Sequence, residues 1–211
     1  ANTASYFYGL RMYYCDAPSI VNNKVYMPIT IPYAYGMYIG YCNNGTGSNP
    51  VLVANNELRL QSTNNSYGIY IMSSRMNIYH NSILAINGAN ATNMGVYISS
   101  ASDLNVKNNN LVTTVPIYLT TLTSLGSTWF MDYNNYYSPL GYIGYANGFI
   151  QSMNAWRTTT SQDIHSISVY PPFKDTSINL KTNGGPIVCN SIPDVSVDIT
   201  GASRGLMTTM G

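Results

Sequence analysis

A short motif that recurs between residues 8 and 119 constrains the fold of this chain more than any other feature. Each copy has a glycine, or once a proline, with apolar residues around it. Successive copies are 21 to 32 residues apart. They are Tyr8 to Met12, Tyr35 to Ile39, Tyr67 to Ile71, Met94 to Ile98 and Val115 to Leu119. The pattern predicts short strands that cannot each bury a face alone and therefore stack upon one another.

A second motif follows each copy of the first and keeps the same cadence. It has an apolar residue, an asparagine three positions later, and an apolar or aromatic residue two positions after that. The asparagines are Asn23, Asn56, Asn81, Asn109 and Asn134. Equivalent positions on stacked coils lie about 4.8 Å apart. We therefore expect an internal ladder in which each amide bonds its neighbour, which is a structural role.

The first motif also predicts which side chains face outward. Residues one before, one after and three after the glycine should share the buried face, because side chains alternate along a strand. Residues two after the glycine, or the equivalent proline, should lie outside and stack on successive coils. They are Arg11, Tyr38, Tyr70, Tyr97 and Tyr118. Tyrosine rings suit the binding of sugar rings or of another protein, although such a stack can also serve stability alone.

The two motifs resemble the repeat of the pectate-lyase-like superfamily, in which a Gly-Ile-x-Ile strand precedes a strand that ends in an Asn-containing turn. The resemblance covers about residues 5 to 140. It implies an all-β chain that forms a right-handed single-stranded parallel β-helix (a β-solenoid) of about five coils with a C-terminal capping region. Lyases, hydrolases, tailspikes and noncatalytic surface proteins share this fold, so it does not determine the activity.

The motifs stop after Ser138 and Pro139, which divides the chain into coils over residues 1–140 and a loop and cap of the same domain over residues 141–211. A short helix is expected within residues 149–156. The later segments resemble the closing part of secreted bacterial β-helix proteins. The residues that carry this resemblance are Asp163, His165, Ser166, Asp198, Gly201 and Arg204. An open coil exposes strand edges, and the lack of a cap before Gly9 predicts further coils or another domain ahead of residue 1.

The composition narrows the functional classes. Charged residues make up 8% of the chain, with 9 basic and 8 acidic side chains, so we expect no surface for nucleic acid or for an anionic membrane. No apolar run is long enough to cross a membrane. The 20 tyrosines and the abundant Asn, Ser and Thr are typical of secreted or cell-surface β-solenoids. Neither a metal nor a cofactor is expected.

Two of the three cysteines should be neighbours on adjacent coils. Cys15 and Cys42 each lie six positions after the glycine of their own repeat. Their expected separation fits a disulfide, and it fits a reduced pair in a packed column equally well. The cysteines are too far apart in the sequence for a zinc motif.

The acidic residues do not share a position on consecutive coils, which argues against the carboxylate clusters of lyases and hydrolases. The candidates for a catalytic patch are Glu57, Arg59, Arg75, His80 and Lys107. Solvated surface charges explain the same residues. Asp163 and His165 are a further candidate acid–base pair, with a hydrogen-bonded cap as the competing interpretation.

Three hypotheses follow. The first is a noncatalytic segment of a secreted or cell-surface protein, part of a larger polypeptide or assembly, that binds a polysaccharide or a cell-surface protein through the outer tyrosines. The second is a polysaccharide lyase or glycoside hydrolase that uses the charged candidates. The third is a structural stalk of an adhesin or fibre that needs no site. We favour the first because the charged residues form no recognisable catalytic set.

Overall fold

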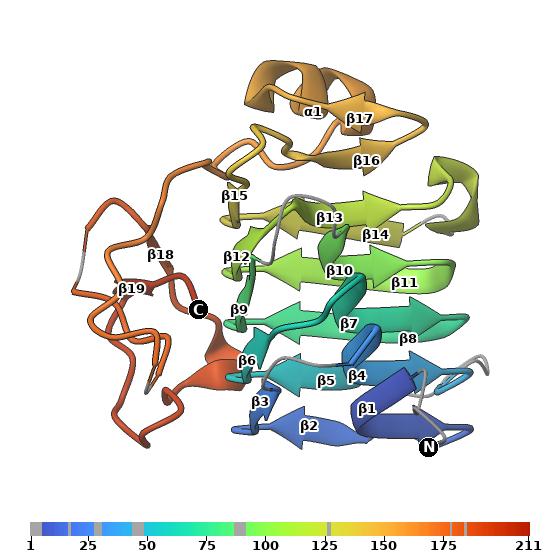
Figure 1. Cartoon of the computed structure of the whole chain (residues 1–211). Coiled ribbons are helices and arrows are strands. Elements are labelled where there is room, and N and C mark those ends of the chain that lie inside the picture. The colour runs from blue at the N-terminus through green and yellow to red at the C-terminus, as the bar shows by residue number, and fades with distance from the viewer. Residues whose placement is uncertain are drawn as a thin grey trace.

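The computed structural model describes residues 6–16, 18–27, 31–43, 49–86, 92–125, 128–177, 179–183 and 185–211. Parallel strands dominate it and form three large stacked sheets (Figure 1). The chain visits sheet A, then sheet B, then sheet C, and returns to sheet A beside its previous strand. This path is consistent with a solenoid, and it confirms the prediction of an all-β chain built from stacked parallel strands.

The three sheets hold nearly all the strands of the chain. Sheet A contains β1 (Tyr6–Tyr13), β4 (Tyr33–Gly40), β7 (Asn65–Met72), β10 (Asn93–Ile98), β13 (Val115–Leu119), β16 (Gly144–Ala146) and the antiparallel β17 (Phe149–Ile150). Sheet B contains β2 (Ser19–Val21), β5 (Val51–Ala54), β8 (Ser74–Tyr79), β11 (Ala101–Lys107) and β14 (Thr128–Asp132). Sheet C contains β3 (Lys24–Met27), β6 (Glu57–Leu60), β9 (Ser82–Ala85), β12 (Asn110–Thr113) and β15 (Asn135–Tyr137).

The core lies between the three sheets. Its side chains come from the inward positions of every coil, and Met37, Val53 and Leu58 on three successive strands are all fully buried. Each such side chain contributes about 1.5–3 kcal/mol by leaving water. A single level cannot enclose these residues, so the core depends on the stacking of levels.

The alternation of side chains in sheet A differs from the prediction at the repeat glycine. A Cβ on Gly68 would lie 2.5 Å from the backbone oxygen of the next coil's glycine and 2.7 Å from Ile83. Gly68 therefore points inward, like the buried Ile69 after it. Tyr67 is half-buried, and its ring contacts that of Tyr70 on the outside. The inward placement predicted for residues before the glycine was wrong for Tyr8, Tyr35 and Tyr67, whose rings stack in one outer column.

The turn from sheet B to sheet C has the same backbone conformation in every coil. The residue before each ladder asparagine is left-handed, with φ between 53° and 60°. Asparagine tolerates this region better than most residues. The five residues are Asn22, Asn55, His80, Asn108 and Tyr133. One coil thus places a histidine where three others have asparagine.

Helix α1 (Met153–Thr160) follows the last strands of sheet A and closes one end of the stack. It lies beyond β16 and β17 at the top of the view (Figure 1). The short 3-10 helix η1 (Leu122–Leu125) lies earlier in the chain and precedes β14. The Ser152 hydroxyl accepts a hydrogen bond from the backbone N–H of Ala155 at 3.2 Å and begins the helix. The helix thus starts later than predicted, because β17 occupies Phe149–Ile150. Its fully buried Trp156 donates to Asp163 at 2.8 Å.

The last part of the chain packs beside the coils and does not cover their end. It contains β18 (Val188–Asn190), the 3-10 helix η2 (Pro193–Val195) and β19 (Met207–Thr209), and it runs along sheet C in Figure 1. Arg204 donates to Asn55 Oδ1 at 2.8 Å, and Asn108 Nδ2 donates to Asn190 O at 2.6 Å. The turn residues between sheets B and C provide these contacts, which hold the segment at the side of the stack.

Candidate functional site

The outer side of sheet A carries a continuous surface of tyrosine rings. Tyr38, Tyr70, Tyr97 and Tyr118 lie in register on four neighbouring strands. Their ring centroids are 4.9, 4.6 and 5.0 Å apart in that order, with angles between ring planes of 6°, 14° and 19°. Tyr145 extends the column, 4.2 Å from Tyr118. The sequence analysis missed it, although it follows Tyr118 by 27 residues, the same interval as from Tyr70 to Tyr97.

A second column runs beside the first and touches it. Its rings meet those of the first column edge to face, for example Tyr35 with Tyr38 at 5.7 Å and Tyr67 with Tyr70 at 5.5 Å. We call the rings of both columns the tyrosine surface. Its members are Tyr8, Tyr35, Tyr67, Tyr38, Tyr70, Tyr97, Tyr118 and Tyr145. Sequence periodicity alone did not find the second column because the alternation shifts at the glycine.

The stacking determines what this surface presents. Neighbouring rings cover each other's faces, so the part of each half-buried ring that remains accessible is its edge. Burial raises the pKa of the Tyr70 hydroxyl to about 12, and neighbouring tyrosines add to this increase. Burial likewise raises the pKa values of Tyr67, Tyr97 and Tyr118. The surface is therefore an uncharged array of hydrogen-bonding groups at neutral and mildly alkaline pH.

Arg11 ends the first column on the side of β1. Its guanidinium carbon lies 5.3 Å from the ring centre of Tyr8, 5.5 Å from that of Tyr13 and 5.7 Å from that of Tyr38. These are cation–π distances. Arg11 thus adds one positive charge at one end of an otherwise neutral surface.

The five catalytic candidates do not gather in one cleft. Arg75 pairs with Asp103 at 2.5 Å, and Lys107 lies 4.3 Å from the ring centre of Phe130, both on sheet B. Arg59 on sheet C donates to the backbone oxygen of Ser177 at 3.4 Å. These three side chains therefore have separate local partners on two different sheets.

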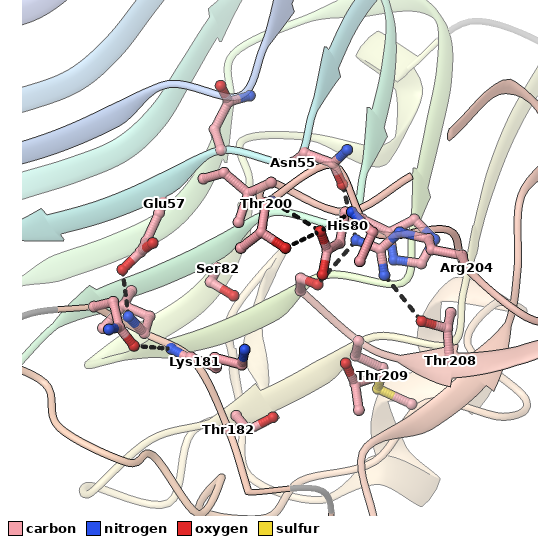
Figure 2. Close-up of a pocket in the computed structure, with 18 of the residues that line it drawn as sticks. Asn55, Glu57, His80, Ser82, Lys181, Thr182, Thr200, Arg204, Thr208 and Thr209 are labelled. Atoms are coloured by element: carbon pink, nitrogen blue, oxygen red, sulfur yellow. Dashed lines mark hydrogen bonds between the residues drawn. The ribbon is translucent and has the colours of Figure 1, made fainter. Parts of the chain in front are cut away.

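Glu57 and His80 are the two candidates that line one cavity (Figure 2). Both are buried beneath the C-terminal segment, at 5% and 1% exposure, so their interpretation as solvated surface charges was wrong. Glu57 accepts hydrogen bonds from Tyr26 Oη and the backbone N–H of Leu180, and it lies 3.5 Å from Lys24 Nζ. Its carboxylate is thus used in holding the segment against sheet C.

The ladder asparagines form one hydrogen-bonded row inside the coils. Their consecutive Nδ2–Oδ1 distances are 2.9, 2.9, 3.0 and 3.0 Å from Asn23 through to Asn134. The row ends on the closing segment, where the backbone N–H of Asn134 donates to Ser166 Oγ at 2.8 Å and its Nδ2 donates to Asp163 Oδ1 at 3.3 Å. Burial raises the pKa of Asp163, which lies wholly inside. Asp163 therefore closes the ladder and is out of reach of a ligand.

His165 pairs with a different acid from the one considered in the sequence. Its Nδ1 lies 2.7 Å from Asp132 Oδ2, and its ring stacks on Tyr133 at 4.6 Å.

Cys15 and Cys42 lie on neighbouring coils as free thiols, and no disulfide joins them. Within the described residues, no group of three or more His, Cys, Asp or Glu side chains could hold a metal ion.

Comparison with known proteins gives no matching family model, no similar curated protein and no similar solved structure. No helix in the described part of the chain has the length and apolar character needed to cross a membrane. The function must therefore be argued from the surfaces themselves.

Proposed function

We propose that the chain is a noncatalytic right-handed parallel β-helix of the pectate-lyase-like kind, from a secreted or cell-surface protein. We further propose that it binds a neutral, extended polysaccharide through the tyrosine surface. The observation that carries this proposal is the continuous contact of tyrosine rings along the outside of sheet A.

Exposure of this surface favours a binding role over stability alone. The rings of both columns are half-buried and keep an edge in solvent. At the β1 end the network continues to Tyr6 and Tyr14, which are 54% and 74% exposed. Large continuous aromatic patches are uncommon on proteins that bind nothing. A stack that only stabilised the coils could be covered by a loop.

The spacing of the surface favours a repeating polymer. Ring hydroxyls recur at each level of the stack, at intervals set by the strand spacing of about 4.8 Å. A polysaccharide presents hydroxyl groups at regular intervals, so one chain laid across the strands meets many equivalent groups. A globular protein without internal repeats offers no such regular array of equivalent groups. Tyrosine side chains are neutral at pH 7, which suits an uncharged polymer.

The dispersion of the charged candidates argues for binding without cleavage. Glycoside hydrolysis needs two carboxyl groups on opposite sides of the scissile bond. Glu57 is held by Tyr26 and Leu180 under the C-terminal segment, and Asp103 is paired with Arg75 on another sheet.

The test is a binding array of neutral and acidic polysaccharides on the purified chain, with release of reducing ends assayed in the same samples. We expect a neutral polysaccharide to bind without cleavage, with an affinity that changes little between low and moderate salt. Tyr70→Ala and Tyr97→Ala should each weaken binding at least about tenfold, as expected for aromatic contacts worth about 1.4 kcal/mol.

Tyr170→Ala is the matched control, because Tyr170 is 54% exposed and contacts only Tyr137 and Phe173 among its ring contacts. This variant should bind like the parent chain. Unchanged affinity in both sheet A variants, with native circular dichroism, would show that the tyrosine surface is not the binding site. Cleavage of any polymer would favour the hydrolase hypothesis.

A further inference from the structure

The outer face of sheet B carries a shallow pocket that the proposed function does not use. It has a volume of about 500 Å³ and lies across β8, β11 and β14. Pockets of this size accept small ligands. The lining includes Arg75, Asp103, Asn105, Thr128, Trp129 and Phe130.

The strand register places four of these side chains within reach of one small ligand. Asp103 and Asn105 are two residues apart on β11, so both point to the same face of the sheet. Leu104 between them is buried, which identifies that face as the outer one. Thr128 and Phe130 lie opposite Asp103 and Asn105 on β14. Strand spacing and rise per residue therefore set the four positions at the corners of an area about 5 Å by 7 Å.

Phe130 gives the pocket an apolar wall. Its side chain is 45% exposed, and its ring contacts no other aromatic ring in the described part of the chain. Lys107 Nζ lies 4.3 Å from the ring centre. Lys107 follows Asn105 by two residues whereas Asp103 precedes it by two, so the ammonium group and the pocket lie on opposite sides of Phe130 along the strand. The ring thus remains available to the apolar face of a ligand.

Asp103 is held in place while its carboxylate stays accessible. Its Oδ2 accepts from Arg75 Nε at 2.5 Å, and its Oδ1 accepts from the Thr128 hydroxyl. The Asp103 side chain nevertheless keeps 32% of its exposure. The hydrogen bond from Thr128, together with that from Arg75, lowers the pKa of Asp103. A carboxylate oxygen accepts more than one hydrogen bond, so ligand hydroxyl groups can still donate to this oriented acceptor.

Asn105 adds a second oriented polar group, directly beside Phe130. Its Nδ2 donates to Asn77 Oδ1 at 2.9 Å, which fixes the amide plane. The amide nitrogen carries a second N–H, and Oδ1 accepts no hydrogen bond from the described residues. Asn105 therefore offers a ligand both a donor and an acceptor.

The lining carries no net charge. Arg75 and Asp103 are its two charged members and form an ion pair with each other, while the rest of the lining, Pro50 included, is uncharged. Lys107 lies beyond Phe130 and outside the lining. A ligand carboxylate would face the charge of Asp103, and a ligand ammonium that of Arg75, so the pocket favours a neutral ligand.

A pyranose ring matches this combination of groups. Its hydroxyl groups both donate and accept, as Asp103 and Asn105 require, and equatorial hydroxyl groups leave a flat face of C–H bonds that fits an aromatic ring. We infer that the pocket binds one neutral pyranose residue, with its C–H face on Phe130 and its hydroxyl groups on Asp103 and Asn105. The site is independent of the tyrosine surface, which lies on sheet A.

The test is an NMR titration of the isotope-labelled full chain with methyl β-D-glucopyranoside, whose ring hydroxyl groups are all equatorial. We expect saturable shifts at the amides of β11 and β14, with a dissociation constant of about 1–10 mM. D-Glucitol has similar hydroxyl groups without the ring, and methyl β-D-glucuronide adds a negative charge. Each should bind at these amides at least about fivefold more weakly.

Phe130→Ala should weaken binding of the glucoside at least about tenfold, and Phe130→Leu, which keeps apolar volume without a flat ring, at least about fivefold. Asp103→Asn should weaken it at least about fivefold, because hydrogen bonds to a charged acceptor are the stronger ones. The lost ion pair is partly exposed, so this variant should keep the circular dichroism of the parent chain.

Phe149→Ala is the matched control, because Phe149 is 54% exposed and lies on β17 of sheet A. It should leave the affinity for the glucoside unchanged, as should Tyr70→Ala, which separates this pocket from the tyrosine surface. Equal binding of D-glucitol, tighter binding of the glucuronide, or parental affinity in Phe130→Ala would each overturn the inference. The absence of shifts in β11 and β14 at up to about 50 mM glucoside would do the same.

Discussion

The two outer faces of this molecule use opposite strategies. The tyrosine surface on sheet A repeats one residue type at every level, stays partly exposed, and is uncharged. The face of sheet C under residues 179–211 is covered, and it gathers different residues, among them Glu57, His80 and Arg204. Repetition follows from the coils themselves, whereas the varied face depends on contacts with a segment that does not repeat. One coil architecture thus presents two chemically different faces.

The two faces also depend differently on backbone packing. On sheet A, adjacent coils approach so closely at the repeat glycine that a side chain has no room. In the C-terminal segment the backbone is less crowded at Gly201 and Gly205, where a new Cβ would have no atom within 3.5 Å. A methyl group added to the backbone should therefore destabilise the chain far more at the repeat glycine than at a glycine of the C-terminal segment that has open space around it.

Gly68→Ala is predicted to have the largest effect. Its Cβ would lie 2.5 Å from a backbone oxygen of the next coil, which cannot move without displacing the strand. We expect a loss of about 3 kcal/mol or more in the free energy of unfolding. Gly205→Ala is the matched change in the C-terminal segment, where the nearest atom to a new Cβ is 3.6 Å away. Its effect should stay within about 1 kcal/mol, as measured by urea denaturation.

A large loss in both variants would show that the backbone at Gly205 is as crowded as the backbone at Gly68. A folded Gly68→Ala chain of parental stability would show that the coils are not packed tightly at the repeat glycine of sheet A.

Acid should destabilise the covered face. The pKa of His80 falls from 6.5 to about 3 in the folded chain, so the unfolded chain binds the proton more readily. The stability that comes from a neutral His80 is complete above pH 6.5 and is lost as the pH falls toward 3. We expect the loss to reach on the order of 3 kcal/mol.

The measurement is the free energy of unfolding of the parent chain and of His80→Asn between pH 7 and pH 4. Asparagine does not titrate, so the difference between the two chains should shrink or reverse as the pH falls. Parallel curves would mean that His80 is accessible to protons in the folded state.

Sequence periodicity explains why one face was predictable and the other was not. The row of Tyr38, Tyr70, Tyr97 and Tyr118 was predicted because these residues repeat with the coils. Tyr145 was missed, although it follows Tyr118 at the same interval of 27 residues. The column of Tyr35 was misplaced because strict alternation was assumed across the glycine. Only the crowding at that glycine, a contact between coils, reveals the two successive inward positions.

The cavity under the C-terminal segment has no such periodic signal. Arg204 and Asn55 are separated by 149 residues, and nothing in their local sequence links them. His80 was noticed as a charged candidate, but its burial depends on a segment more than a hundred residues later. Long-range packing of an irregular segment is decided by surface fit, which one sequence does not encode in any short pattern.

The tyrosine surface should respond to substitution more weakly than the core or the covered face. Tyr70 stacks with Tyr38 at 4.9 Å and with Tyr97 at 4.6 Å. Tyr70→Ala removes both contacts and should lower the free energy of unfolding by about 1–2 kcal/mol. Tyr70→Phe keeps the ring stack and should change it by less than about 0.5 kcal/mol at pH 7.

Alkaline pH separates these two variants further. The pKa of Tyr70 rises from 10.0 to about 12 on folding, so its contribution is complete below pH 10 and is lost as the pH rises toward 12. The loss in the free energy of unfolding should be below about 1 kcal/mol, because water screens the charge of the partly exposed Tyr70 hydroxyl. Unfolding curves at pH 8 and pH 11 should therefore show a smaller decrease for Tyr70→Phe than for the parent chain. An equal decrease would mean that the raised pKa values belong to other tyrosines, and the stack would then be less desolvated at Tyr70 than its ring contacts indicate.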